Sequence, residues 1–211
     1  MNRQLISKLT SKQRLHGCNI PILGLTGGIA SGKTTVANML KDLGIEVINA
    51  DELVKEIYST QEAIGFIQKV APECVINHDI NFPSLRQQVF DDESLQEKIE
   101  TFIYARLPKK FLERAANSPW VVYDVPLLFE KELNEMVDSI LLIATKREIQ
   151  KQRLIERDNS TEQLADKILD LQWPLEDKKK MSDYIIENNS NLESLKESLD
   201  LFISSDDYFT S

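Results

Sequence analysis

The stretch Gly27–Thr34, with the sequence GGIASGKT, constrains this chain more than any other feature. It matches the pattern G-x-x-x-x-G-K-[ST], in which backbone amides surround a polyphosphate, the lysine reaches the outer phosphates and the hydroxyl suits magnesium. An apolar run at 22–25 precedes it, and apolar residues with helical spacing follow at 36–40, so the setting is strand, loop and helix. The stretch predicts binding of a nucleoside triphosphate or a close analogue. The alternative is a glycine-rich turn without a ligand.

Composition narrows the class of protein. A chain of 211 residues fits one large domain or a core domain with inserted subdomains. The net charge of −9 argues against a nucleic acid or an anionic membrane as partner. Two cysteines make no disulfide framework and favour a cytoplasmic location. No apolar run approaches the ~18 residues of a membrane span.

The two ends of the chain differ from the middle. Residues 1–20 contain four basic residues and no acidic one. We expect a poorly ordered extension there, with an organelle transit peptide as the alternative. Residues 205–211 are expected to form a frayed polar tail, which leaves 21–204 as the folded domain.

Short apolar runs alternate with helical patterns along 21–204. This alternation predicts an α/β fold with a parallel five-stranded sheet covered by helices on both faces. The expected strands are 22–25, 46–48, 120–123, 140–144 and 184–186. Residues 60–118 interrupt the alternation with charged helical segments, so we expect a helical subdomain inserted there.

Three helices have start signals of the capping-box type, in which a hydroxyl residue stands three positions before Glu or Gln. We expect them to begin near Thr145, Ser160 and Ser190.

Two aspartates follow predicted strands, at the sheet edge where ligands of open α/β folds bind. Asp51 comes after the second strand and fits either a general base for an attacking hydroxyl or a helix N-cap. Asp124 ends the third strand and fits either a carboxylate that supports magnesium or a turn residue before Pro126.

A basic helix follows the fourth strand. Gln150, Arg153 and Arg157 are spaced i, i+3, i+7 and share one face. Two guanidinium groups on one face can clamp transferring phosphates or stack on a base. The alternative is a solvated surface on which they pair with neighbouring acids such as Asp158.

Taken together, the motifs resemble one family, the dephospho-CoA kinases. The matching segments are Leu25–Ala37, Asn49–Asp51, Val125–Glu130, Gln150–Asp158, Gln172–Lys178 and Ser182–Asn188. The resemblance implies a P-loop kinase fold with an inserted helical substrate subdomain and an arginine-bearing lid at about 146–175. It implies ATP-dependent phosphorylation of the ribose 3′-hydroxyl of dephospho-CoA, with Mg²⁺. We expect the chain to be a monomer or a weak homo-oligomer.

The resemblance also implies roles for single residues. Asp51 becomes the expected general base, Arg153 a nucleotide contact that acts with Lys33 in catalysis, and Arg157 its lid partner. Asn188 is expected near the adenine end of the ATP site, and Thr34 at the magnesium ion. The expected loop contacts to the nucleotide are Gly28, Ile29, Ala30, Ser31, Gly32, Lys33, Thr34 and Thr35.

The chain departs from the family pattern at several positions. Asn49 stands where the family has the first acid of Asp-Ala-Asp, and Lys55 stands where it often has Arg. In the helical insert, Phe82 and Thr101-Phe102 replace other expected side chains. Two other functions therefore stay open: a kinase for another small acceptor such as a nucleoside monophosphate, and a non-catalytic nucleotide-binding relative.

Overall fold

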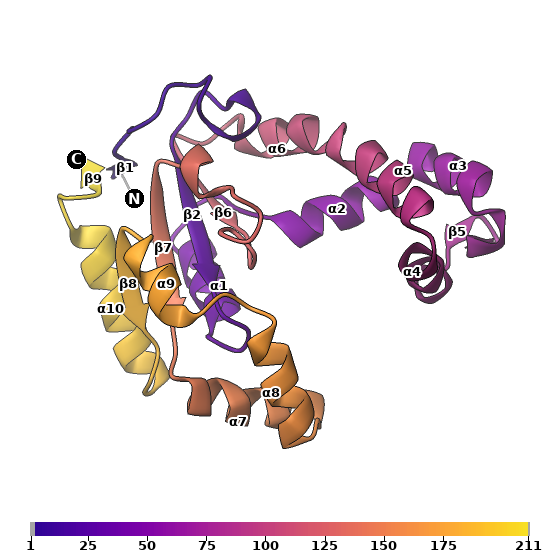
Figure 1. Ribbon diagram of the computed structural model, residues 1–211. Helices are drawn as coiled ribbons and strands as arrows, with labels where there is room; N and C mark the ends of the chain where they lie inside the picture. The colour runs from indigo at the N-terminus through magenta and orange to yellow at the C-terminus, as the bar shows by residue number, and fades with distance from the viewer. Residues whose placement is uncertain (1–2, 211) are drawn as a thin grey trace. The chain divides into compact units, whose positions relative to one another are not determined.

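The computed structural model describes residues 3–210 and divides the chain into two compact units (Figure 1). One contains the described residues before Ala50 and after Arg114, and the other is Ala50–Arg114. Within the described part of the chain, no helix is long and apolar enough to cross a bilayer.

The larger unit contains a five-stranded parallel sheet with the strand order β3-β6-β2-β7-β8. Its strands are β2 (Ile22–Gly27), β3 (Val47–Asn49), β6 (Val121–Asp124), β7 (Ser139–Ala144) and β8 (Tyr184–Glu187). Every residue of β2, β6 and β7 is buried, as expected for strands covered on both faces. The predicted α/β fold is confirmed, and each expected strand lies within two residues of its predicted bounds.

Helices of this unit pack on the sheet and on each other. They are α1 (Lys33–Asp42), α7 (Arg147–Asp158), α8 (Glu162–Asp170), α9 (Leu175–Lys180) and α10 (Leu192–Ser204), with short 3-10 turns η1 (Leu15–Gly17) and η3 (Asn134–Met136). Apolar residues of α1 and α10, such as Leu40 and Phe202, join the core of the sheet around Leu25 and Leu141.

The predicted helix starts need correction. The N-caps of α8 and α10 are Thr161 and Asn191, one residue after the predicted serines, and each side chain accepts a bond from the helix. The predicted capping box at Thr145 is wrong, because α7 begins after Lys146 without a side-chain cap.

Both chain ends are folded where the structure describes them. Strand β1 (Gln4–Leu5) pairs antiparallel with β9 (Phe209–Thr210). Leu5 and Phe209 are buried, and the Phe209 ring lies 5.3 Å from that of Trp120. The expectation of a poorly ordered extension and a frayed tail is therefore wrong for residues 3–20 and 205–210, because each end supplies apolar residues that cover the other. Residues 1, 2 and 211 lie outside the described chain.

A buried ion pair holds the N-terminal segment to the sheet. The Arg14 guanidinium donates to both oxygens of Asp138, which also accepts bonds from the N–H groups of Lys8, Leu9 and Ile22. Burial by itself would raise the pKa of Asp138, but these donors outweigh it and hold the pKa below its usual range.

The second unit, Ala50–Arg114, is helical and begins about ten residues earlier than the predicted insert at 60–118. It contains α2 (Ala50–Tyr58), α3 (Gln61–Val70), α4 (Phe82–Asp91), α5 (Glu93–Tyr104) and nearly all of α6 (Leu107–Ala115). Between α3 and α4 lie η2 (Pro72–Cys74) and an unpredicted hairpin of β4 (Val75–Ile76) and β5 (Asp79–Ile80). Its own core includes Ile67, Leu85 and Phe102.

Replacing Arg14 by Met should lower the free energy of unfolding by about 3 kcal/mol at pH 7, because Asp138 keeps a buried charge without its counterion. The pKa of Asp138 is lower in the folded than in the unfolded chain, so its contribution is present above about pH 4 and is lost as the pH falls through the folded pKa. The difference from wild type in denaturant melts should shrink below about pH 4. The exposed Lys12→Met is the matched control, and an Arg14→Met penalty no larger than that of Lys12→Met would contradict the prediction.

Candidate functional site

The predicted phosphate loop joins β2 to α1. Gly32 caps α1 in a left-handed conformation with φ of 91°, and its carbonyl accepts the N–H of Val36 as the helix begins. Ala30 also has a positive φ, of 57°, which is uncommon for a residue with a side chain. The loop is thus a strained strand-to-helix turn of the kind that functional sites retain.

The carbonyl groups of this loop accept hydrogen bonds from side chains in the segments that follow β7 and β8. Gln150 Nε2 donates to Ile29 O at 2.7 Å, and Arg153 Nη1 to Ala30 O at 3.4 Å. Asn188 Nδ2 donates to Ser31 O at 2.8 Å, and Thr145 Oγ1 lies 3.1 Å from the same oxygen. These contacts fix the orientation of three successive peptide groups, which a loop needs if its amides are to meet an anion.

Lys33, the lysine of the loop, forms an ion pair with Asp124 at the end of β6. The other oxygen of Asp124 accepts a bond of 2.7 Å from the Asn49 side-chain amide. Asn49 and Asp124 are register partners in neighbouring strands, which explains why they meet. The sequence left two roles for Asp124, a carboxylate near magnesium or a turn residue. Asp124 is 2% exposed and pairs with the lysine of the loop, so it lies at the phosphate loop and not in a surface turn.

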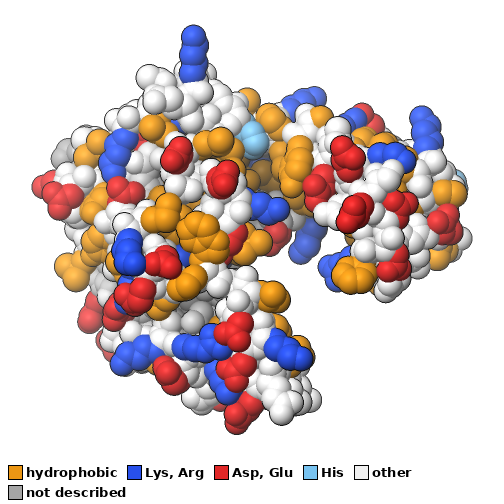
Figure 2. All heavy atoms as spheres, in the orientation of Figure 1, with side chains coloured by type: hydrophobic (Ala, Val, Ile, Leu, Met, Phe, Trp, Pro, Cys, Tyr) orange, Lys and Arg blue, Asp and Glu red, His pale blue; other side chains and the backbone are white. Residues whose placement is uncertain are grey.

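Of the three residues on the basic face of α7, two lie at the phosphate loop and one lies in the solvated surface. Gln150 and Arg153 face the loop, and Arg153 also reaches Asn188 O at 3.4 Å. Arg157 instead forms a surface ion pair of 2.7 Å with Asp158, which raises the pKa of Arg157 and lowers that of Asp158. Figure 2 shows basic and acidic side chains intermixed over the part of the surface formed by α7 and α8.

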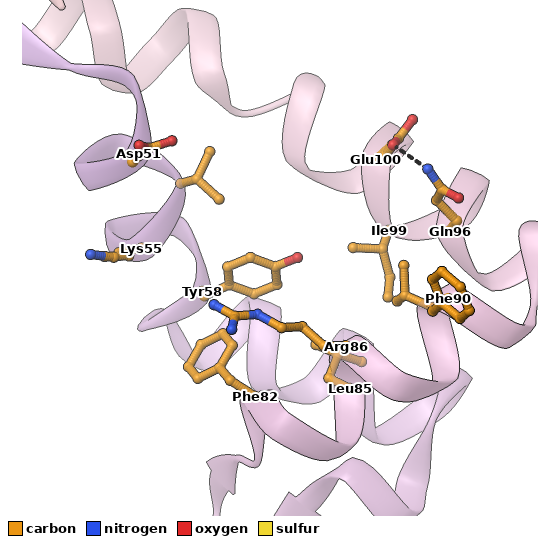
Figure 3. A pocket seen from close by; sticks show the side chains of 12 residues that line it. Asp51, Lys55, Tyr58, Phe82, Leu85, Arg86, Phe90, Gln96, Ile99 and Glu100 are labelled. Carbon is orange, nitrogen blue, oxygen red and sulfur yellow. Dashed lines mark hydrogen bonds between the residues drawn. The ribbon is translucent and has the colours of Figure 1, made fainter. Parts of the chain in front are cut away.

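Asp51 belongs to the helical unit and lies in the first turn of α2, two residues beyond Asn49 along the chain. It is exposed and stands at the edge of a pocket of about 1050 Å³ within that unit (Figure 3). The lining residues are Asp51, Val54, Lys55, Tyr58, Phe82, Leu85, Arg86, Val89, Phe90, Gln96, Ile99 and Glu100.

This pocket combines aromatic walls with charges of both signs. The rings of Tyr58 and Phe82 meet edge to face with centroids 5.3 Å apart. Lys55 and Arg86 supply positive charge on the same side of the pocket, and Glu100 lies on the other side (Figure 3). Burial and the charge of Glu100 raise the pKa of Tyr58, so its phenol stays protonated. An organic anion with an aromatic group suits such a pocket.

Oxygen donors are available for a divalent cation at the phosphate loop. The described residues contain no group of three or more His, Cys, Asp or Glu that would hold a metal ion by themselves. Mg²⁺, however, keeps several waters and is bound by one or two protein oxygens together with substrate phosphates. The exposed Thr34 hydroxyl and the Asp124 carboxylate fit that requirement.

Comparison with known proteins places this chain in a family. Residues 21–194 match the family model described as dephospho-CoA kinase. The chain belongs to the dephospho-CoA kinase family. A dephospho-CoA kinase of Fusobacterium nucleatum is 38% identical over 191 residues, which are 87% of this chain and 97% of that protein. One of Geobacillus kaustophilus is 37% identical over 186 residues, 84% of this chain and 92% of that protein.

A solved structure has a similar fold. The crystal structure of the Thermus thermophilus protein TT1252 superimposes with a TM-score of 0.76 and 27% sequence identity. The match covers 88% of this chain and 97% of that one. The family match begins at residue 21, so the segment that forms β1 and η1 precedes it.

In this family member, several contacts of the loop were not predicted from the sequence. Thr145 does not cap α7 but lies 3.1 Å from Ser31 O. Asn188, expected near the adenine end of the ATP site, donates to the same oxygen. Gln172 Oε1 accepts the N–H of Ile29 at 2.8 Å. Both Gln172 and Asn188 belong to segments that carried the family resemblance, which was the available signal.

Replacing Gly32 by Ala should weaken ATP binding at least about tenfold, because the φ of 91° is unfavourable for a side chain and the new Cβ would collide with the Asn188 amide. Isothermal titration with ATP measures the effect. Gly65→Ala is the matched control, because Gly65 lies inside α3 with nothing within 4 Å of a new Cβ. It should leave ATP binding unchanged and stabilise the chain by about 0.5–1 kcal/mol. Equal ATP affinity in the Gly32→Ala variant would contradict this account of the loop.

Proposed function

We propose that this chain transfers the γ-phosphate of ATP to the ribose 3′-hydroxyl of dephospho-CoA and so forms coenzyme A, in the last step of its biosynthesis. The observation that carries the proposal is the phosphate loop braced on its carbonyl side, in a chain that matches the dephospho-CoA kinase family over residues 21–194. We propose further that it acts in the cytoplasm as a monomer or weak homo-oligomer. Its two cysteines, Cys18 and Cys74, are free and buried, which agrees with a reducing compartment.

At the nucleotide end, the backbone amides of the loop and the Lys33 ammonium bind the β- and γ-phosphates. Lys33 forms its ion pair with Asp124 at the end of the loop, and this pair neutralises both charges. A bound triphosphate would offer the Lys33 ammonium further negatively charged oxygens beside Asp124. Little covalent chemistry falls to the protein in such a transfer, so orientation and charge supply most of the rate.

Thr34 and Asp124 are the residues that would hold Mg²⁺, Asp124 through water because both its oxygens already accept bonds from protein donors. Held there, the ion would supply positive charge that offsets the negative charge of the phosphates. Asn49 keeps Asp124 oriented, and an acid at position 49 would instead place two carboxylates against each other.

At the acceptor end, Asp51 serves as the general base that accepts the proton of the 3′-hydroxyl. Its carboxylate is exposed at the edge of the 1050 Å³ pocket, one helical turn from Lys55. Lys55 and Arg86 suit the diphosphate of dephospho-CoA, and the aromatic walls suit its adenine ring.

Arg153 and Arg157 neutralise the charge that develops on the transferred phosphate as the lid closes over it. The bonds of Arg153 to Ala30 O and Asn188 O are long, at 3.4 Å, so exchanging them for phosphate oxygens costs little. Arg157 would leave its exposed pair with Asp158, which is worth little in water.

Replacing Asp51 by Asn should lower kcat by at least about 100-fold in an assay with dephospho-CoA and MgATP, because the base is lost while the shape is kept. ATP affinity should stay within about twofold, since the phosphate loop is untouched. Asp79→Asn, on the exposed hairpin of the same unit, is the control. Near-wild-type turnover would remove Asp51 from the role of base. Failure of the wild type to phosphorylate dephospho-CoA would overturn the proposed function.

Replacing Arg86 by Gln should raise the KM for dephospho-CoA about tenfold or more and leave the KM for ATP unchanged, because a charge-assisted bond to the acceptor's diphosphate is lost. Steady-state kinetics with each substrate varied in turn measures the split. Lys69→Gln, exposed on α3 and outside the pocket, is the charge-matched control. A change confined to the KM for ATP would show that the pocket does not hold the acceptor.

A further inference from the structure

Two motifs that carried the family resemblance have no part in the mechanism described above. One is Pro-Leu-Leu-Phe-Glu, which ends at Glu130, and the other is the segment from Gln172 to Lys178. The structure brings them together: Glu130 Oε1 lies 2.8 Å from Lys178 Nζ and accepts the Trp173 N–H at 3.3 Å. The Trp173 ring also stacks on that of Phe129, with 6.3 Å between centroids and 14° between planes.

The ion pair in this contact is withdrawn from water. Lys178 is 1% exposed, and the Glu130 side chain 15%. Replacing a buried pair of this kind by apolar residues is often neutral for stability, since desolvation offsets the attraction. Stability alone therefore does not account for two charges placed there. Their geometric effect is to fix the turn between α8 and α9, which contains Gln172 and Trp173.

Gln172 extends this connection to the phosphate loop. Its Oε1 accepts the N–H of Ile29 at 2.8 Å, while Gln150 Nε2 donates to the carbonyl of the same residue at 2.7 Å. Two glutamine amides thus hold both polar backbone groups of Ile29. A Cβ added at Gly28 would collide with the Gln150 amide and lie 3.5 Å from Gln172 Oε1. The absence of a side chain at Gly28 leaves room for the Gln150 amide in this position.

We propose that Gln172 and Gln150 are positioning residues for the phosphate loop, and that the buried Glu130–Lys178 pair acts through Gln172 by holding its turn in place. This proposal rests on the proposed function and deepens its ATP site. A loop that is already oriented loses less conformational freedom when the triphosphate binds, so the bracing contributes to ATP affinity. Strand β6 reaches the loop through the Asp124–Lys33 pair, and the segment after β6 reaches it through Glu130, which holds the turn that contains Gln172.

The direct test replaces Gln172 by Met, which keeps the length of the side chain and removes the acceptor. Hydrogen exchange of the Ile29 amide, measured by NMR without nucleotide, should become at least about tenfold faster. ATP binding, measured by titration, should weaken about fivefold to tenfold, as expected for one lost hydrogen bond. The melting temperature should change little, because Gln172 is partly exposed.

Gln152→Met is the matched control for this test. Gln152 lies exposed on α7 and donates to the exposed Glu156 at 2.9 Å. It should leave Ile29 exchange and ATP affinity as in the wild type. Unchanged Ile29 exchange and ATP affinity in Gln172→Met would overturn the positioning role.

Testing the role of the Glu130–Lys178 pair requires a variant that still folds. Lys178→Met alone leaves a buried carboxylate without its counterion, so the double variant Glu130→Gln, Lys178→Met carries the test. It should melt close to the wild type, yet show the fast Ile29 exchange and weak ATP binding of Gln172→Met. Adding Gln172→Met to it should produce little further loss, because both changes break the same connection. Wild-type exchange and affinity in the double variant would overturn the role of the ion pair.

These measurements use ATP and the free protein, without an acceptor. Loss of transfer to dephospho-CoA with intact ATP binding would overturn the proposed function and leave the positioning of Ile29 standing. Unaltered Ile29 exchange in Gln172→Met, in a protein that does phosphorylate dephospho-CoA, would overturn the positioning role and leave the proposed function standing.

Discussion

A backbone loop that offers its N–H groups to an anion must have its carbonyl groups held in place from the other side. In this chain three successive carbonyls, from Ile29 to Ser31, accept side-chain bonds. The donors Gln150, Arg153 and Asn188 come from segments that follow β7 and β8. The order of strands in the parallel sheet brings these distant segments to the end of β2. The nucleotide site depends on that convergence as well as on the residues of the loop.

Charge at this edge of the sheet is balanced within a small set of residues. The negative Asp124 is shared between the Lys33 ammonium and the Asn49 amide, so the end of β6 carries no uncompensated charge. Asn49 departs from the acidic pattern of the family, and its amide shows how the departure is accommodated: it donates where a second carboxylate would repel. The substitution thus agrees with a retained phosphate site rather than with its loss.

Sequence patterns predicted the elements whose signals are local. The five strands were found because each is a short apolar run, and the phosphate loop because glycine, lysine and threonine occur at a spacing with one structural meaning. The helix starts at Thr161 and Asn191 were missed by one residue, since neighbouring polar residues are all competent caps. The termini were misjudged because β1 and β9 have two residues each and are stable only when paired.

The sequence alone determined that the chain has a phosphate loop between a buried strand and a helix, and it indicated the family through short motifs. Those properties depend on residues that are neighbours along the chain. Only the tertiary structure decided what Thr145, Gln172 and Asn188 do, because each contacts the loop across more than 100 positions of sequence. A side chain's partner at such separation is set by how strands are ordered in the sheet, and no local pattern contains that order.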